Sequence, residues 1–156
     1  MLSQKEAAHL MSLPKRSETN DIYNFPPPKE MLKLPLISHN GKERFFIDIN
    51  RRGILISRCS YQERYRKTVI LARLDIHGPP HRNPKVDKVP FPFLAPYNGK
   101  ELSSPHLHIY VEGFDDKWAI SADCFPHTSD LYQTLLDFFD FCNVIKPPRV
   151  MKGLFT

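Results

Sequence analysis

Five stretches of the chain are typical of β-strands, and this feature constrains the fold most; apolar and polar residues alternate in two of them, residues 64–76 and 106–111. In residues 106–111, HLHIYV, three apolar side chains alternate with His106, His108 and Tyr110. The other four stretches are residues 44–50, 54–59, 64–76 and 117–121. The turn-forming residues 50–53 between the first two indicate a hairpin, so the sequence predicts a sheet built mainly of neighbouring antiparallel strands.

Helical signals lie at the two ends of this run of strands. Ser3 and Glu6 form a capping-box pattern, which predicts a short helix that ends before Pro14. Leu131, Leu135 and further apolar residues up to position 142 recur at helical spacing and predict a last helix. The expected fold is therefore α+β, a single antiparallel sheet of about five strands with an N-terminal and a C-terminal helix.

The length of 156 residues suits one domain, residues 1–156. Residues 15–30 end in a run of prolines and are expected to form a Pro-rich connecting segment. Residues 77–105 hold seven prolines and several aromatics, which favours a long ordered loop of the kind that often carries function.

Cysteine content and hydropathy exclude several classes of protein. The three cysteines, Cys59, Cys124 and Cys142, form no C-x-x-C pair, so neither a zinc ribbon nor a disulfide framework is expected. No run of about 18 apolar residues occurs, and the N-terminus does not resemble a signal peptide. We therefore expect a cytoplasmic protein with no membrane partner.

The densest polar stretches are residues 73–84, RLDIHGPPHRNP, and residues 105–110, PHLHIY. If their strands are neighbours, their polar side chains share one patch, although alternation within each strand does not establish that adjacency. Such a patch suits RNA cleavage without a metal, because histidine can act as acid or base near neutral pH and arginine can hold a phosphate. The expected catalytic residues are His81, His106, His108, Asp75 and Tyr110, and the expected phosphate-binding residues are Arg73 and Arg82.

Two other interpretations of the patch stay open. Histidines on a solvated sheet face often have no role, and Arg73 beside Asp75 is consistent with a simple ion pair. The histidines also suit a metal such as zinc. However, an H-x-H pattern is a weak signal, and the proline turn between His77 and His81 removes any helical meaning from their spacing. We therefore expect no metal and no cofactor.

Positive charge concentrates between residues 41 and 73, which hold nine basic and three acidic residues. The whole chain has a net charge of +5. Arg64, Arg66 and Lys67 are interleaved with Tyr61 and Tyr65, and such mixtures bind nucleic acid through phosphates and base stacking. The expected partner is RNA or another anionic molecule. A solvated hairpin face explains the same charges.

The motifs R-x-D-x-x-G (from Arg73), H-x-N-P (from His81), P-H-x-H-x-Y (from Pro105) and Gly-x-x-x-Lys-Trp-Ala (from Gly113) resemble an uncharacterised family of short bacterial and prophage proteins. The resemblance implies a bacterial or mobile-element setting, in which small basic proteins are often toxins, antitoxins or anti-defence factors. No function carries over from it.

Two functions follow as hypotheses. The first is a metal-independent endoribonuclease; as the toxin of a toxin–antitoxin pair it would have a cognate antitoxin as partner. The second is a non-catalytic binding protein encoded by a phage or mobile element, an antitoxin or an anti-defence inhibitor. It would dock through its basic face on a nucleic acid or a host defence protein.

Overall fold

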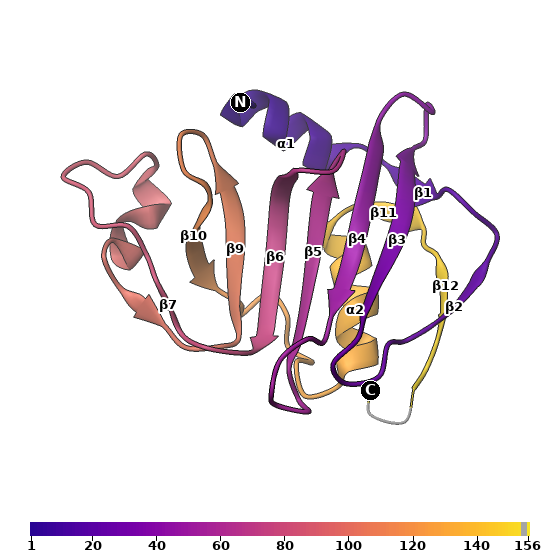
Figure 1. The fold of residues 1–156 in the computed structure, drawn as a ribbon. Helices are drawn as coiled ribbons and strands as arrows, with labels where there is room; N and C mark the ends of the chain where they lie inside the picture. The colour runs from indigo at the N-terminus through magenta and orange to yellow at the C-terminus, as the bar shows by residue number, and fades with distance from the viewer. Residues whose placement is uncertain (154–155) are drawn as a thin grey trace.

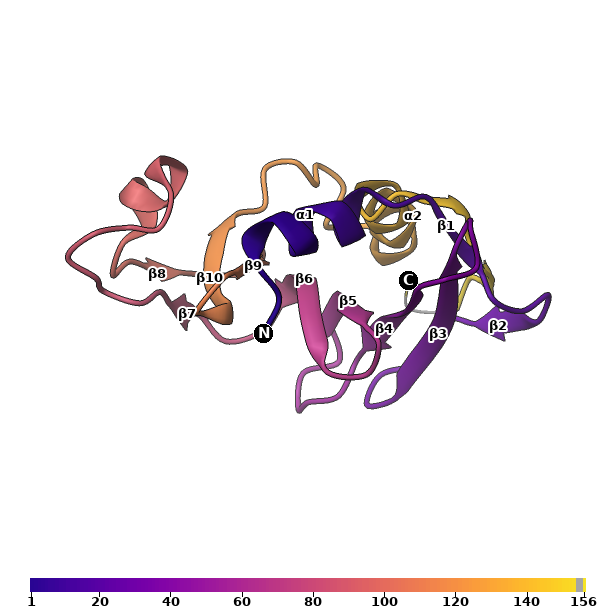
Figure 2. The same ribbon diagram turned by 90° about the horizontal axis from the view of Figure 1, so that it is seen from above.

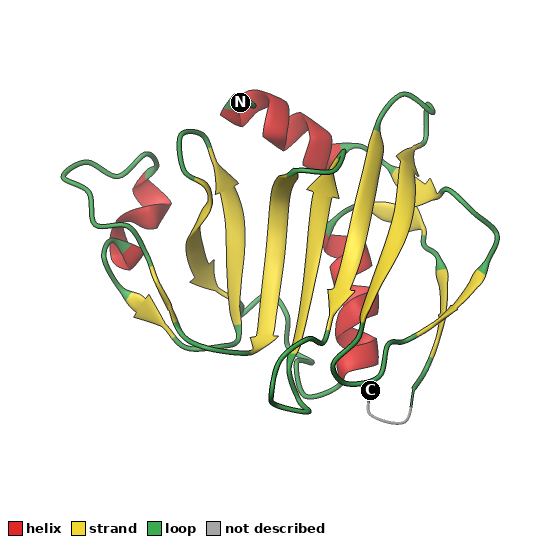
Figure 3. Cartoon of the chain, viewed as in Figure 1, coloured by secondary structure: helices red, strands yellow, loops and turns green. Residues whose placement is uncertain are grey.

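The computed structural model describes residues 1–153 and 156, and its elements place the protein in the α+β class (Figures 1 and 3). The helices are α1 (Gln4–Ser12), α2 (Leu131–Phe141) and the short 3₁₀ helix η1 (Pro92–Tyr97). The predicted capping box starts α1: the Ser3 side chain accepts from the backbone of Glu6, and the Glu6 side chain accepts from the backbone of Ser3.

One large mixed sheet dominates the described part of the chain. Its eight strands lie in the order β10-β9-β6-β5-β4-β3-β1-β11, and every neighbouring pair is antiparallel except β1 and β11. In that order, the bounds are Asp115–Ser121, His106–Val111, Val69–His77, Cys59–Tyr65, Arg44–Asn50, Met31–Ser38, Lys15–Ser17 and Val144–Lys146. Two small sheets accompany it: parallel β2 (Ile22–Asn24) and β12 (Arg149–Met151), and antiparallel β7 (His81–Arg82) and β8 (Glu101–Leu102).

The predicted single antiparallel sheet of about five strands is therefore wrong. Strand β3 contains Pro35, which interrupts a strand signal because proline has no N–H for the ladder. Strands β1 and β11 have three residues each, too few to show a period. The last predicted helix is not C-terminal, since β11 and β12 follow α2.

Two strand boundaries also differ from the prediction. Of the predicted strand 54–59, only Cys59 lies in a strand; residues 54–58 lie in the loop before β5, where Ile54 is 97% exposed. The Arg51 side chain stabilises this loop by donating to the backbone oxygen of Ile56 at 2.8 Å. The predicted strand 64–76 is divided by a turn at residues 66–68, where Arg66 has a φ of 55°.

Both α-helices lie on the same side of the large sheet (Figure 2). On that side, Tyr61 and Leu74 are paired across β5 and β6, both are completely buried, and Tyr61 packs on Phe138 of α2. The alternate residues therefore face the other side. There the ladder register aligns Lys33, Asp48, Gln62, Arg73 and His108 in one polar row across five strands.

No helix among residues 1–153 combines the length and the apolar character that a membrane crossing requires.

Candidate functional site

The two motif-bearing strands are direct neighbours in the large sheet. In the β6–β9 ladder, Asp75 lies opposite His106, and Arg73 lies opposite His108. Cross-strand partners project from the same face of a sheet with their Cβ atoms about 5 Å apart. The adjacency that the sequence left open is therefore present, and it brings four of the predicted site residues together.

Arg73 lies at the centre of the resulting cluster. Its Nε donates to Asp75 Oδ1 at 3.0 Å, and its Nη1 donates to Asp116 Oδ2 at 2.8 Å. Its Nη2 lies 3.0 Å from Nε2 of His108. The guanidinium thus uses each of its three nitrogens on a different side chain, which fixes the relative positions of these groups.

Asp75 connects Arg73 to both histidines of β9. Its Oδ2 lies 3.2 Å from Nε2 of His106 and 3.2 Å from Nε2 of His108. Burial raises the pKa of Asp75, but its contacts with the two histidines and the positive charge of Arg73 outweigh this effect. The net effect holds the pKa of Asp75 well below its ordinary value, so this carboxyl group is an anion at neutral pH.

A β-bulge in β10 orients two of the imidazole rings. The β9–β10 register shifts between Asp115 and Trp118, and two backbone carbonyls of this irregular stretch bind histidines. The oxygen of Asp116 is 2.9 Å from His108 Nδ1, and the oxygen of Lys117 is 2.8 Å from His81 Nε2. Because a carbonyl only accepts, each of these two ring nitrogens carries a proton. In the neutral rings, His108 Nε2 and His81 Nδ1 are then the nitrogens without a proton, and they can accept one.

His81 lies beside the two buried rings. Its ring centroid is 4.5 Å from that of His108 and 6.0 Å from that of His106, and the residues His106 and His108 are each 1% exposed. Partial burial lowers the pKa of His81, an effect that its hydrogen bond to Lys117 opposes and the charges of its neighbours reinforce. The buried Nδ1 of His106 has no hydrogen-bond partner among the described residues.

The other predicted site residues lie outside this cluster. Tyr110 donates its hydroxyl to the backbone oxygen of Leu2 at 2.6 Å, so its hydroxyl is engaged just before α1. The Arg82 guanidinium donates to the backbone of Gly99, on the loop that precedes β8. Arg64 binds both carboxylate oxygens of Asp48, and its charge is thereby neutralised. Arg66 and Lys67 are exposed in the turn between β5 and β6.

Two residues that support the cluster were not predicted. Asp116 binds Arg73 with its side chain and His108 with its backbone. Asn83 lies two residues after His81 and hydrogen-bonds both backbone groups of Ala119 in β10. In the sequence, each was marked only by its place inside one of the family motifs. The contacts of Asp116 depend on the bulge in β10, and that bulge follows from strand pairing.

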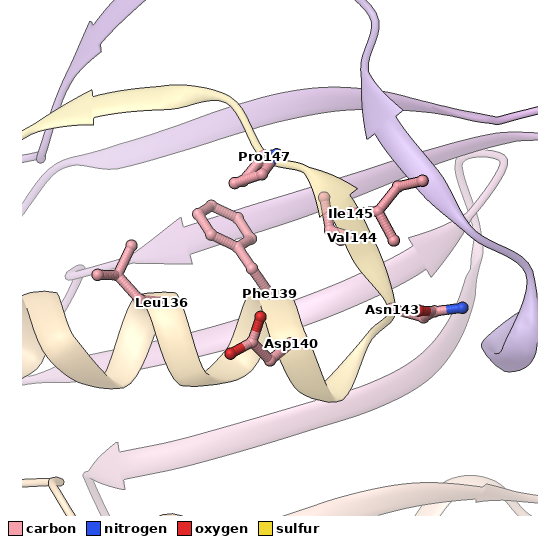
Figure 4. Close-up of a pocket in the computed structure, with 7 residues that line it drawn as sticks. All are labelled: Leu136, Phe139, Asp140, Asn143, Val144, Ile145 and Pro147. Atoms are coloured by element: carbon pink, nitrogen blue, oxygen red, sulfur yellow. The ribbon is translucent and has the colours of Figure 1, made fainter.

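A surface hollow lies near the other edge of the large sheet from this cluster. It is lined by Leu136, Phe139 and Asp140 of α2 together with Ile145 and Pro147 (Figure 4). Strand β11 is the opposite edge of the sheet from β10, so the hollow and the histidine cluster are separated by most of the sheet. The hollow gathers one carboxylate and no histidine, which makes it a weaker candidate for chemistry.

The fold and the cluster together define an α+β protein with a His/Asp/Arg centre on the three strands β6, β9 and β10 at one edge of a large sheet. A family model matches residues 2–144, and the chain belongs to that family, described as Family of unknown function (DUF6978). Comparisons with curated proteins and with solved structures found no match. The matched range includes all the residues of the cluster.

Proposed function

We propose that this protein is an endoribonuclease that transfers protons with the histidines of the cluster and needs no metal for the reaction. The observation that supports this proposal is the β6–β9 register, which places Arg73 and Asp75 opposite His108 and His106. Two imidazoles, a carboxylate and a guanidinium within hydrogen-bonding reach are the groups that acid–base cleavage of a phosphodiester uses.

His81 is the best-placed proton acceptor of the three rings. Its Nε2 is held by the carbonyl of Lys117, and its side chain is only partly buried. In the proposed reaction Nδ1 takes the proton of the ribose 2′-hydroxyl while the 2′-oxygen forms a bond to phosphorus. The bond from phosphorus to the 5′-oxygen breaks, a histidine of β9 protonates that oxygen, and a 2′,3′-cyclic phosphate remains.

Arg73 is the cation nearest to the reacting groups in this proposal. Its side chain is 25% exposed, and that of Asp75 is 17% exposed, so the cluster has an accessible side. A guanidinium held by two carboxylates is already oriented before substrate binds, which reduces the cost of ordering it. In a toxin–antitoxin setting, an antitoxin would inhibit by covering this side.

The first prediction concerns His81. We expect His81→Ala to lower the cleavage rate of single-stranded RNA in the presence of EDTA by at least about 100-fold, the usual contribution of one general acid or base. His77→Ala is the matched control, because His77 is an exposed histidine at the end of β6 and should leave the rate unchanged. Intact RNA after incubation with the wild-type protein would contradict the proposal.

The near-complete burial of His106 and His108 favours a second candidate, a non-catalytic binding protein of phage or mobile-element origin. It would act as an antitoxin or an anti-defence inhibitor and dock on an anionic partner through the exposed turn at Arg66 and Lys67. The charge reversal Arg66→Glu/Lys67→Glu should then abolish the effect of the protein in a growth assay, whereas His81→Ala should preserve it. The reverse pattern would exclude this candidate.

A further inference from the structure

We propose that Asp75, His106 and His108 form a binding site for one divalent transition-metal ion of the zinc or cobalt type. This inference departs from the metal-free expectation drawn from the sequence, and it does not depend on RNA cleavage. The three residues each offer one ligand atom, and these atoms lie within 4.8 Å of one another.

The spacing of the ligand atoms fits a small tetrahedral ion. With ligand bonds of about 2.0–2.1 Å and tetrahedral angles, neighbouring ligand atoms are roughly 3.3 Å apart. The two distances from Asp75 Oδ2 to the Nε2 atoms of His106 and His108 are both 3.2 Å. Two of the three distances between the protein ligand atoms therefore already fit a tetrahedral ion. Only the third, between the Nε2 atoms of His106 and His108, needs to change.

The orientation of His108 is that of a metal ligand. Its Nδ1 donates to the carbonyl of Asp116, which turns Nε2 toward Asp75. A backbone carbonyl on the far nitrogen is a common way in which proteins orient a ligating histidine and raise its basicity. His106 is 1% exposed, and its Nε2, the atom that would bind the metal, lies 3.2 Å from Asp75 Oδ2. Its Nδ1 has no hydrogen-bond partner among the described residues.

Local charge favours a cation at this position. The carboxylates of Asp75 and Asp116 both contact the single guanidinium of Arg73, and a carboxylate beside two imidazoles is a ligand set that suits borderline divalent metals. Binding requires that Arg73 Nη2 release His108 Nε2, while its other two nitrogens keep their carboxylates. Metal binding and the proposed RNA cleavage therefore use Arg73 and the histidines of β9 in different ways, and each is tested separately.

The test is a Co²⁺ titration of the full chain after EDTA treatment and dialysis, followed by visible absorption and by displacement with Zn²⁺. We expect one ion per chain with the intense bands of a low-coordinate site. Asp75→Asn and His106→Ala should each weaken binding at least tenfold, whereas His77→Ala and His127→Ala, both at exposed histidines, should not.

Absence of stoichiometric binding by the wild type, or equal weakening by the control variants, would overturn the inference. Circular dichroism checks that each variant is folded; if His106→Ala is not, Asp75→Asn, which preserves side-chain volume, decides. RNA cleavage in EDTA is measured separately. Cleavage without metal binding removes only this inference, and metal binding without cleavage removes only the ribonuclease proposal.

Discussion

At the scale of single residues, Asn83 joins the loop after β7 to the edge strand β10 of the large sheet. Its amide donates to the backbone oxygens of Ala119 at 2.7 Å and Tyr97 at 3.1 Å, and its Oδ1 accepts from Ala119 N at 2.7 Å. The side chain is 3% exposed. It therefore substitutes for a neighbouring strand along part of β10, and it lies two residues from His81.

We predict that Asn83→Ala destabilises the protein by about 1–3 kcal/mol, because it leaves buried backbone groups without partners. Chemical denaturation followed by tryptophan fluorescence measures the change, since Trp118 is next to Ala119. Asn24→Ala, at an exposed asparagine of β2, is the control and should stay within about 0.5 kcal/mol of wild type. Equal effects of the two variants would show that the contacts of Asn83 contribute little.

At the scale of elements, β1 and β5 meet the end of α2 at a buried charged pair. Lys15 Nζ lies 3.1 Å from Glu63 Oε1, and neither side chain is exposed. Lys15 also donates to the backbone oxygens of Met11 and Cys142. Burial raises the pKa of Glu63 to about 7, against the opposing effects of the Lys15 charge and of hydrogen bonds from Lys15 and Cys142.

This raised pKa predicts how stability changes with pH. The pKa of Glu63 is about 7 in the folded state against 4.5 for the ordinary group, so folding favours the protonated form. Its contribution to stability is complete below about pH 4.5 and is lost as the pH rises through about 7. Glutamine does not titrate, so Glu63→Gln should remove this pH-dependent contribution. We therefore expect the stability of the variant to fall less than that of wild type between about pH 5 and pH 8.

Thermal unfolding at several pH values measures this difference. Glu101→Gln is the control, because Glu101 is exposed, and it should follow the wild-type profile. Parallel profiles for wild type and Glu63→Gln would mean that Glu63 titrates alike in the folded and unfolded states.

Elements whose signal is local were predicted well. The strands predicted at residues 44–50 and 106–111 match β4 and β9 to the residue, and the capping box at Ser3 marks the start of α1. The prediction failed for residues 54–56, which are apolar and β-branched or long but lie in an exposed loop. Local propensity cannot distinguish an apolar residue that packs from one that does not, since packing depends on distant parts of the chain.

At the scale of the whole molecule, pairing between distant segments decided what could be predicted. The histidine cluster was expected because its residues alternate correctly within two strands, and the β6–β9 ladder brings those strands together. The roles of Asp116 and Asn83 depend on the register of β10 and on a bulge, and neither is encoded in a short window. The extent of the sheet was missed for the same reason, since β1 pairs with a strand from the other end of the chain.

The parallel pairing of β1 with β11, repeated in the small sheet by β2 and β12, has a consequence for biosynthesis. The segment that closes this edge is translated long after β1, because β11 follows α2 in the chain. Until then β1 keeps one row of backbone donors and acceptors unpaired, and such an edge can associate with other chains. This edge therefore stays open until β11 pairs with β1, whereas the β4–β5–β6 meander can form earlier because its strands are consecutive in the chain.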